Sequence, residues 1–217
     1  MQQRKLINTV LLPPEVLDVR PWQWQGFKAA VHYTYTTNFH FNFDLTDHYV
    51  RSHSYQCKQD RYHCDRTTDL KEVMACLQDI EARAGFQFLL KLDDLKLAQE
   101  LMGIEHFRVY ACFAPNRKMA AVRIVLYTVH TRAIDWVLGT LSTHLRSGAV
   151  QCLTKYCIED LQLAGANNID FCGANIQGVA LAKANWRGLL VSYYNLDEHN
   201  IRQLARWIRD WWRVRRK

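Results

Sequence analysis

The sequence predicts an α/β (α+β) fold with a central mixed, mostly antiparallel sheet flanked by helices. Three segments carry this prediction. Residues 31–45 alternate aromatic, β-branched and polar side chains, as a long strand does. Residues 106–141 hold three apolar runs separated by turns, the pattern of an antiparallel meander. Residues 168–196 read as strand, glycine turn, helix, glycine and strand.

The remaining elements follow from the same periodicities. Asp69 is a candidate cap for one helix, and Gly103 is a candidate stop for the next. After the long strand, the predicted order is a helix over 46–60, a short strand near 62–66, helices over 70–85 and 92–102, strands over 106–114, 119–130 and 133–141, a helix over 148–164, a strand over 168–172, a helix over 177–185 and a strand over 189–196.

Length and composition predict one globular domain. The chain has 217 residues, of which 49% are hydrophobic, and this length suffices for one sizeable core. We expect an N-terminal segment over 1–30, a single domain over 31–200 and a basic amphipathic helix over 201–217. No run approaches the roughly 18 apolar residues of a spanning helix, and the start lacks a signal-peptide core. We therefore expect a cytoplasmic protein.

The positive charge is concentrated at one end of the chain. Residues 201–217 hold seven Arg or Lys residues and one Asp, which leaves a net charge of +1 for residues 1–200 out of the total of +7. Apolar residues recur there at helical spacing between the arginines. Such a helix packs on the domain, lies on an anionic membrane at its inner face, or binds the phosphates of tRNA.

Seven cysteines, an odd number without C-x-x-C spacing, predict reduced thiols rather than a disulfide framework. One short span contains four side chains that could bind a metal, His53, Cys57, His63 and Cys64. Adjacent His63 and Cys64 do not easily face one ion, and two well-spaced pairs are absent. We therefore expect no metal site, and a zinc-dependent protein is the most distant alternative.

Two consecutive passages resemble the C-terminal core of the GNAT acyltransferase superfamily, RSGAVQCLTKYCIEDLQLAGAN and NIDFCGANIQGVALAKANWRGLLVSYY. The similar branch contains the Fem-type peptidoglycan-bridge aminoacyltransferases and acetyltransferase-like relatives, with a DF-x-G strand end and a final YY strand. The passage PWQWQGFKAAVHYTY, residues 21–35, is similar to the start of the second lobe of two-lobed relatives. The resemblance implies the GNAT fold and a second lobe alone, over about residues 21–196.

The resemblance also implies a site for acyl-CoA or acetyl-CoA. In this superfamily the pyrophosphate lies on N–H groups at the start of the central helix, where the helix dipole favours an anion. Gly148 would let the backbone approach closely, Ser147 would cap the helix and Arg146 would add charge. The usual second glycine of the loop is absent. The implied cofactor-binding residues are Leu138, Gly139, Arg146, Ser147, Gly148, Ala149, Val150 and Asn175.

The resemblance implies general acid–base chemistry at two neighbouring strands. The attacking amine must lose a proton, so a carboxylate or histidine is expected. Asp170 is the aspartate of the DF-x-G pattern, Asp135 lies on the adjacent strand, and His130 is the histidine alternative. Tyr194, or else Tyr193, would protonate the departing thiolate. Four aromatic residues are the implied substrate-binding set, Trp24, Tyr33, Tyr35 and Trp136.

The implied activity is transfer of an acyl group from a thioester carrier to an amine. The acceptor would be an amino sugar, an amino acid or a cell-envelope precursor, and a homodimer would rebuild the cleft that two lobes form in relatives. One alternative is an aminoacyl-tRNA-dependent transferase. The other is a non-catalytic binding module on a degenerate GNAT scaffold, suggested by the incomplete glycine loop.

Overall fold

The computed structural model describes residues 9–84 and 90–198, and its strands form one eight-stranded sheet. The strand order is β1-β8-β2-β7-β6-β5-β4-β3. Neighbours β6 and β7 are parallel, and the other described pairs are antiparallel, which confirms the predicted mixed sheet. The strands are β1 (Thr9–Leu11), β2 (Phe27–Asn38), β3 (His63–Arg66), β4 (Phe107–Phe113), β5 (Met119–Leu126), β6 (Arg132–Thr140), β7 (Asn168–Asp170) and β8 (Leu189–Glu198).

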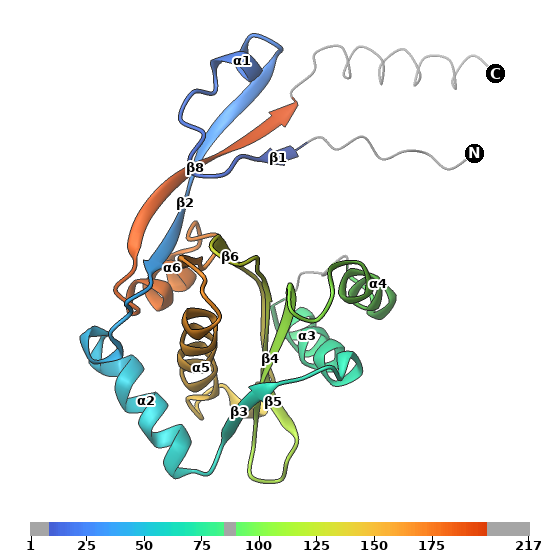
Figure 1. The fold of residues 1–217 in the computed structure, drawn as a ribbon, viewed down its shortest axis with the longest axis vertical. Helices are drawn as coiled ribbons and strands as arrows, with labels where there is room; N and C mark the ends of the chain where they lie inside the picture. Colours follow the sequence, from blue (N-terminus) through green and yellow to red (C-terminus); the bar gives the residue numbers. More distant parts are fainter. Residues whose placement is uncertain (1–8, 85–89, 199–217) are drawn as a thin grey trace, which may run out of the picture.

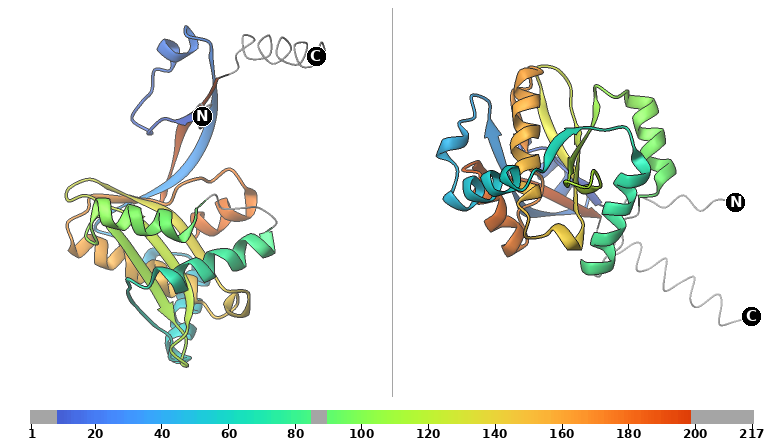
Figure 2. Two further views of the ribbon diagram at one scale, coloured as in Figure 1. Left: turned by 90° about the vertical axis from the view of Figure 1, so that its right-hand side faces the viewer. Right: turned by 90° about the horizontal axis from the view of Figure 1, so that it is seen from below.

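Helices cover both faces of the sheet (Figures 1 and 2). Helices α3 and α4 lie on one face, and α2 and α5 lie on the other. The central strands β4 and β5 are therefore buried almost throughout, which explains their nearly continuous apolar sequences. The helices are α1 (Arg20–Gln23), α2 (His48–Gln59), α3 (Leu70–Ala84), α4 (Leu92–Met102), α5 (Ala149–Leu163) and α6 (Gln177–Ala184).

Each face of the sheet has its own hydrophobic core. On the α5 side, Leu153 and Leu161 are fully buried against the sheet. On the α3 side, Val73 and Leu77 pack against β5. Burial of one large aliphatic side chain contributes about 1.5–3 kcal/mol, so these two stripes supply much of the driving force that fixes the helices on the sheet.

Side-chain caps place two of the helix starts. The Asp69 carboxylate accepts hydrogen bonds from the N–H groups of Lys71 and Glu72, as predicted for α3. Helix α2 is capped by Asp47, whose carboxylate accepts from the Tyr49 N–H. Such caps satisfy N–H groups that a helix start otherwise leaves without partners.

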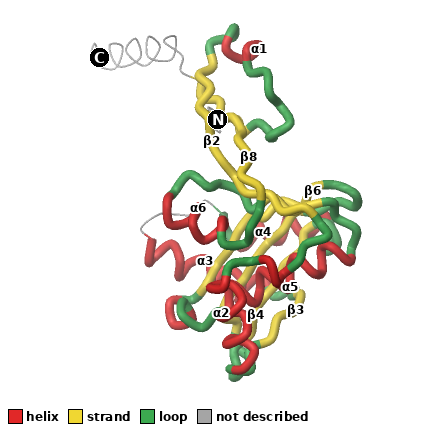
Figure 3. The backbone as a smooth tube through the Cα atoms, turned by 90° about the vertical axis from the view of Figure 1, so that its left-hand side faces the viewer, coloured by secondary structure: helices red, strands yellow, loops and turns green. Residues whose placement is uncertain are grey.

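Strands β2 and β8 form a long ribbon that projects from the body of the molecule, and the short β1 pairs with the far end of β8 (Figures 1 and 3). Strands β2 and β8 pair from Phe27 opposite Glu198 to Thr36 opposite Leu189, and the end of β2 also pairs with β7. Strand β2 begins at Phe27 and thus crosses the predicted boundary at residue 30. It ends at Asn38, earlier than predicted, because the Asn42 side chain accepts from the Asp44 N–H and starts a short 3-10 turn.

The basic segment 201–217 lies outside the described residues, so its helix and its membrane or tRNA contacts stay predictions. Across residues 9–84 and 90–198, none of the helices combines the length and the hydropathy that a membrane crossing requires.

Candidate functional site between strands β6 and β7

The candidate site lies where β6 and β7 diverge. Their parallel pairing covers Arg132–Ile134 opposite Asn168–Asp170, after which β6 continues to Thr140 while β7 ends. A pocket of about 430 Å³ occupies the gap. Its walls come from β5, β6, the residues after β7, the start of α5 and one side of α6. The divergence thus gives a ligand access to the centre of the sheet.

A β-bulge in β6 lies beside this pocket. Ile124 is paired with Val137 and Val125 with Asp135, which leaves Trp136 as the extra residue. A bulge turns side chains away from the regular alternation, and bulges are frequent beside active sites. Asp135 and Trp136 are both among the residues that line the pocket. The indole of Trp136 packs edge-on against Phe107, a residue of the α3-side core.

Arg123 of β5 and Asp135 of β6 form a buried ion pair at the base of the pocket. Their side chains are 4% and 5% exposed, and Arg123 Nη1 lies 3.2 Å from Asp135 Oδ2. Arg123 Nη2 donates to the Thr154 hydroxyl of α5 at 2.8 Å. Three of the six buried side-chain atoms that have no hydrogen-bond partner in the described structure belong to this pair, Arg123 Nε, Arg123 Nη1 and Asp135 Oδ1. Buried polar groups are normally satisfied, so the pair is a candidate for contact with a polar ligand.

Lys183 of α6 brings a third charge to the same pocket. Its ammonium donates to the carbonyl oxygens of Phe171, Cys172 and Gly173, at 2.6 Å from the first and 2.8 Å from the last. These contacts fix the loop that follows β7. Burial lowers the pKa of Lys183, while the nearby Asp135 carboxylate raises it. The pocket therefore contains two cations around one buried carboxyl.

Burial raises the pKa of Asp135, and this effect outweighs the attraction of Arg123 and Lys183. The Asp170 carboxylate raises it further. A raised pKa makes a carboxylate a stronger base, a property that carboxyl groups at functional sites often have.

We expect the contribution of Asp135 to stability to fall as pH rises. The folded state holds the Asp135 proton more tightly than the unfolded chain, in which the pKa is about 4. The contribution is thus fully present below that value and is lost as pH rises through the folded pKa. Urea titrations of the wild type and Asp135→Asn from about pH 3 to about pH 8 test this. A difference in unfolding free energy that grows with pH would mean that the Arg123 ion pair dominates.

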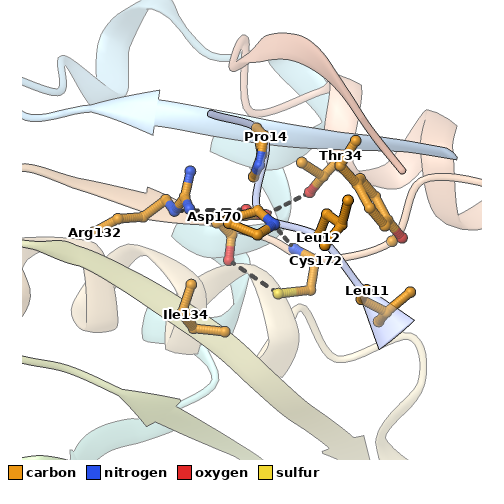
Figure 4. A pocket seen from close by; sticks show the side chains of 11 residues that line it. Leu11, Leu12, Pro14, Thr34, Arg132, Ile134, Asp170 and Cys172 are labelled. Atoms are coloured by element: carbon orange, nitrogen blue, oxygen red, sulfur yellow. Dashed lines mark hydrogen bonds and ion pairs between the residues drawn. The ribbon is translucent and has the colours of Figure 1, made fainter. Parts of the chain in front are cut away.

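Asp170 lines a second pocket of about 520 Å³. Its Oδ1 accepts from the Thr34 hydroxyl at 2.5 Å and from the Cys172 N–H at 2.8 Å, and Arg132 Nε lies 3.9 Å from Oδ2 (Figure 4). Leu11, together with the residues that follow it, forms an apolar wall of the same pocket. The two predicted catalytic carboxylates therefore line different pockets.

Cys172 lies between the two pockets and lines both. Its backbone has φ +50°, a left-handed conformation that is uncommon outside glycine and asparagine and that occurs often at functional sites. Burial, with the charges of Asp170 and Asp135, raises the pKa of its thiol to about 12. Cys172 is thus a neutral thiol at physiological pH rather than a nucleophile.

The other predicted site residues are distributed over three regions. Leu138 and Val150 line the first pocket together with Asp135 and Trp136. Tyr193 lines the second pocket, whereas Tyr194 packs in the ribbon against the cluster of Leu12, Val19 and Leu196. The amide of Asn175 accepts from the Tyr33 N–H, Tyr35 packs against the α5-side core, and Trp24 is exposed near the tip of the ribbon.

The predicted pyrophosphate loop is covered by α2. Gly148 has φ +74°, and a Cβ atom there would lie 2.1 Å from the carbonyl oxygen of His53. Gly148 and Ala149 are buried, Arg146 is exposed, and the Ser147 hydroxyl accepts from the Ala149 N–H. The close approach of α2 accounts for the glycine.

Gly139, another predicted cofactor-binding residue, lies where α3 packs on the opposite face of the sheet. A Cβ atom there would lie 2.9 Å from a Val122 methyl and 3.1 Å from a Leu77 methyl, so the glycine allows α3 to pack closely.

Sequence reasoning missed Arg123 and Lys183. Arg123 had a signal, because a single cation inside the apolar run MAAVRIVL must be paired once that strand is buried. No sequence pattern indicated a role for Lys183, because the residues around it in α6 are typical of an ordinary helix with one polar face. His53, Cys57, His63 and Cys64 were considered above as metal ligands, and no metal site was expected there. The part of the chain that the structure describes holds no group of three or more His, Cys, Asp or Glu residues arranged to hold a metal ion.

No protein-family model and no curated protein matches the sequence. Solved structures match by fold. FemX matches with a TM-score of 0.66 and 9% identity, over 88% of this chain and 70% of that chain. The C-terminal domain (DUF2156) of a protein described as a lysylphosphatidylglycerol synthetase from Agrobacterium fabrum matches with a TM-score of 0.65 and 12% identity, over 84% of this chain.

A third structure is the GCN5-related glucosamine N-acetyltransferase region of a fungal multi-domain β-N-acetylglucosaminidase. It matches with a TM-score of 0.52 and 10% identity, over 82% of this chain and 22% of that chain. These matches show that the chain has a GNAT-type fold. The chain spans 65% of the length of the Agrobacterium domain. A second copy of the chain that would complete a cleft stays a prediction.

Proposed function

We propose that the chain is a GNAT-type acyltransferase that moves an acyl group onto an amine in the pocket between β6 and β7. The main support is the buried pair of Arg123 and Asp135, two residues that line that pocket and carry atoms without hydrogen-bond partners in the described structure. The acceptor would be an amino sugar, an amino acid or a cell-envelope precursor. The fold shared with FemX and with the glucosamine N-acetyltransferase region agrees with this chemistry.

Each charged group has a role in the proposed reaction. Attack of an amine on an ester or thioester carbonyl places negative charge on the carbonyl oxygen, which donors at fixed positions stabilise. The free N–H groups of Arg123 are such donors. Asp135 would take the proton that the amine loses. Lys183 would keep the β7 loop in place through its three carbonyl contacts and add positive charge.

The donor is either a CoA thioester or an aminoacyl-tRNA ester. In the first case, the pyrophosphate would need free N–H groups at the start of α5. That start is buried beneath α2, where the His53 carbonyl approaches Gly148. This observation favours the aminoacyl-tRNA ester. The basic segment 201–217 would then contact the RNA, or else hold the protein at the inner face of the membrane.

A transfer assay with a blocked pocket tests the proposal. Purified protein is incubated with a panel of primary amines and labelled aminoacyl-tRNA, or with labelled acetyl-CoA in a parallel arm, and label in amide linkage is measured. Ala182 lines the pocket, so Ala182→Trp should abolish transfer. Leu181 is an exposed residue of the same helix outside the pocket lining, and Leu181→Trp should retain it.

The outcomes separate the hypotheses. Transfer from aminoacyl-tRNA alone supports the ester donor, and transfer from acetyl-CoA alone supports the thioester. Transfer that is unchanged in Ala182→Trp would place the reaction elsewhere. The absence of transfer and of donor binding in both arms would favour a non-catalytic binding module.

A further inference from the structure

Four cysteines from four different elements meet on the side of the sheet covered by α2 and α5. They are Cys57 of α2, Cys64 of β3, Cys112 of β4 and Cys152 of α5, and all are free thiols. Cys57, Cys112 and Cys152 are buried members of the α5-side core, and Cys64 packs against the same core. The four cysteines therefore form one cluster, apart from the pocket between β6 and β7.

Within this cluster, Cys64 and Cys112 have backbone positions suited to a disulfide. They lie directly opposite each other in the antiparallel β3–β4 pair. Opposite residues in such a pair have Cα atoms about 4.5–5.5 Å apart, which is inside the range of about 4.4–6.8 Å that a disulfide spans. A bond between them would need no movement of either strand.

Access also distinguishes Cys64 from its neighbours. Cys57 and Cys112 are 0% exposed and Cys152 is 5% exposed. Cys64 is partly exposed and lies on β3, the last strand at its edge of the sheet. A small oxidant in solvent therefore reaches Cys64 first.

The two sulfurs of the pair differ in pKa, because hydrogen bonding to Cys112 and Cys152, together with burial, raises the pKa of Cys64. Hydrogen bonds from Cys57 and Cys64 lower the pKa of Cys112 to about 5, and the nearby His63 contributes in the same direction. Thiolates are the reactive form of cysteine in oxidation and exchange. The Cys112 thiolate lies on the residue opposite Cys64 in the β3–β4 pair and would accept the Cys64 proton as the Cys64 sulfur attacks.

We propose that Cys64 and Cys112 form an oxidation site that hydroperoxides convert from a dithiol into a disulfide. The Cys64 sulfur attacks a peroxide oxygen, the O–O bond breaks, one water leaves and a sulfenic acid forms. The Cys112 sulfur then attacks the Cys64 sulfur, the S–O bond breaks and a second water leaves. Two thiols lose two electrons and two protons, and hydrogen peroxide is reduced to two waters.

Peptide mapping of the full chain tests this site. The reduced protein is treated with one equivalent of hydrogen peroxide, its remaining thiols are blocked with N-ethylmaleimide, and digested peptides are identified by mass spectrometry. We expect a peptide pair joined through Cys64 and Cys112 that dithiothreitol separates. Cys64→Ser should abolish the pair. Cys76→Ala should keep it, because Cys76 is buried in the α3-side core, away from the cluster.

Three results would overturn the inference. The first is oxidation of Cys64 to sulfinic acid without any joined peptide. The second is an equal rate of thiol loss in the wild type and in Cys64→Ser. The third is stoichiometric zinc in the purified protein together with resistance of all four thiols to N-ethylmaleimide, which would assign the cluster to metal binding instead.

Discussion

Gly148→Ala is expected to lower the free energy of unfolding by roughly 2–5 kcal/mol. Two costs add: the left-handed backbone, φ +74°, costs an alanine about 1–2 kcal/mol, and overpacking costs about 1–3 kcal/mol. The added Cβ would lie 2.1 Å from the His53 carbonyl oxygen, a backbone atom that moves only if α2 moves. Urea denaturation followed by circular dichroism measures the change.

Gly165→Ala is the control for this effect. Gly165 ends α5 with a left-handed backbone, φ +86°, and the Ala166 N–H donates to the Leu161 carbonyl, but a Cβ atom there would meet its nearest neighbours only at 3.9 Å, an ordinary contact. Its substitution should cost only the backbone part, about 1–2 kcal/mol. Equal losses in the two variants would show that the packing of α2 against the start of α5 adjusts without cost.

Asp135→Ala is expected to reduce both activity and stability. Loss of the general base should lower the rate of acyl transfer by about 10²–10⁴-fold. Removing one partner of a buried ion pair typically costs about 3–5 kcal/mol, because the Arg123 charge would remain buried and unpaired. Single-turnover transfer and urea denaturation measure the two effects separately.

A double variant separates the chemical role from the structural one. Arg123→Met combined with Asp135→Leu replaces the pair by apolar groups of similar volume, a change that is often neutral for stability. We expect this variant to regain most of the lost stability and to remain inactive. Recovery of transfer together with stability would mean that the charges only support the fold.

The elements of the fold could be predicted because their periodicities are local. The meander, the α3 cap at Asp69 and the stop at Gly103 each depend on residues close together in the chain. The position of the long strand β2 in the sheet could not be predicted from local sequence patterns. Its partners, β7 and β8, begin at Asn168 and Leu189, and no local pattern gives a register over that separation.

The site was predicted only in part for a related reason. Asp135 was identified, but its pairing with Arg123 depends on a bulge that shifts the register of β6 against β5. Tyr193 and Tyr194 look equivalent in the sequence, yet successive strand residues face opposite sides, so only one of them lines the second pocket. The cysteine cluster likewise depends on four elements that are distant in sequence.

The insertion of β2 between β7 and β8 has a consequence for how the protein is made. Contacts between residues near 30 and residues near 195 have a long sequence separation, and such contacts slow folding because loop closure must precede them. During synthesis, β2 leaves the ribosome long before β8 exists. Its apolar side chains then lack their final neighbours, which exposes the nascent chain to aggregation and gives chaperones a segment to bind.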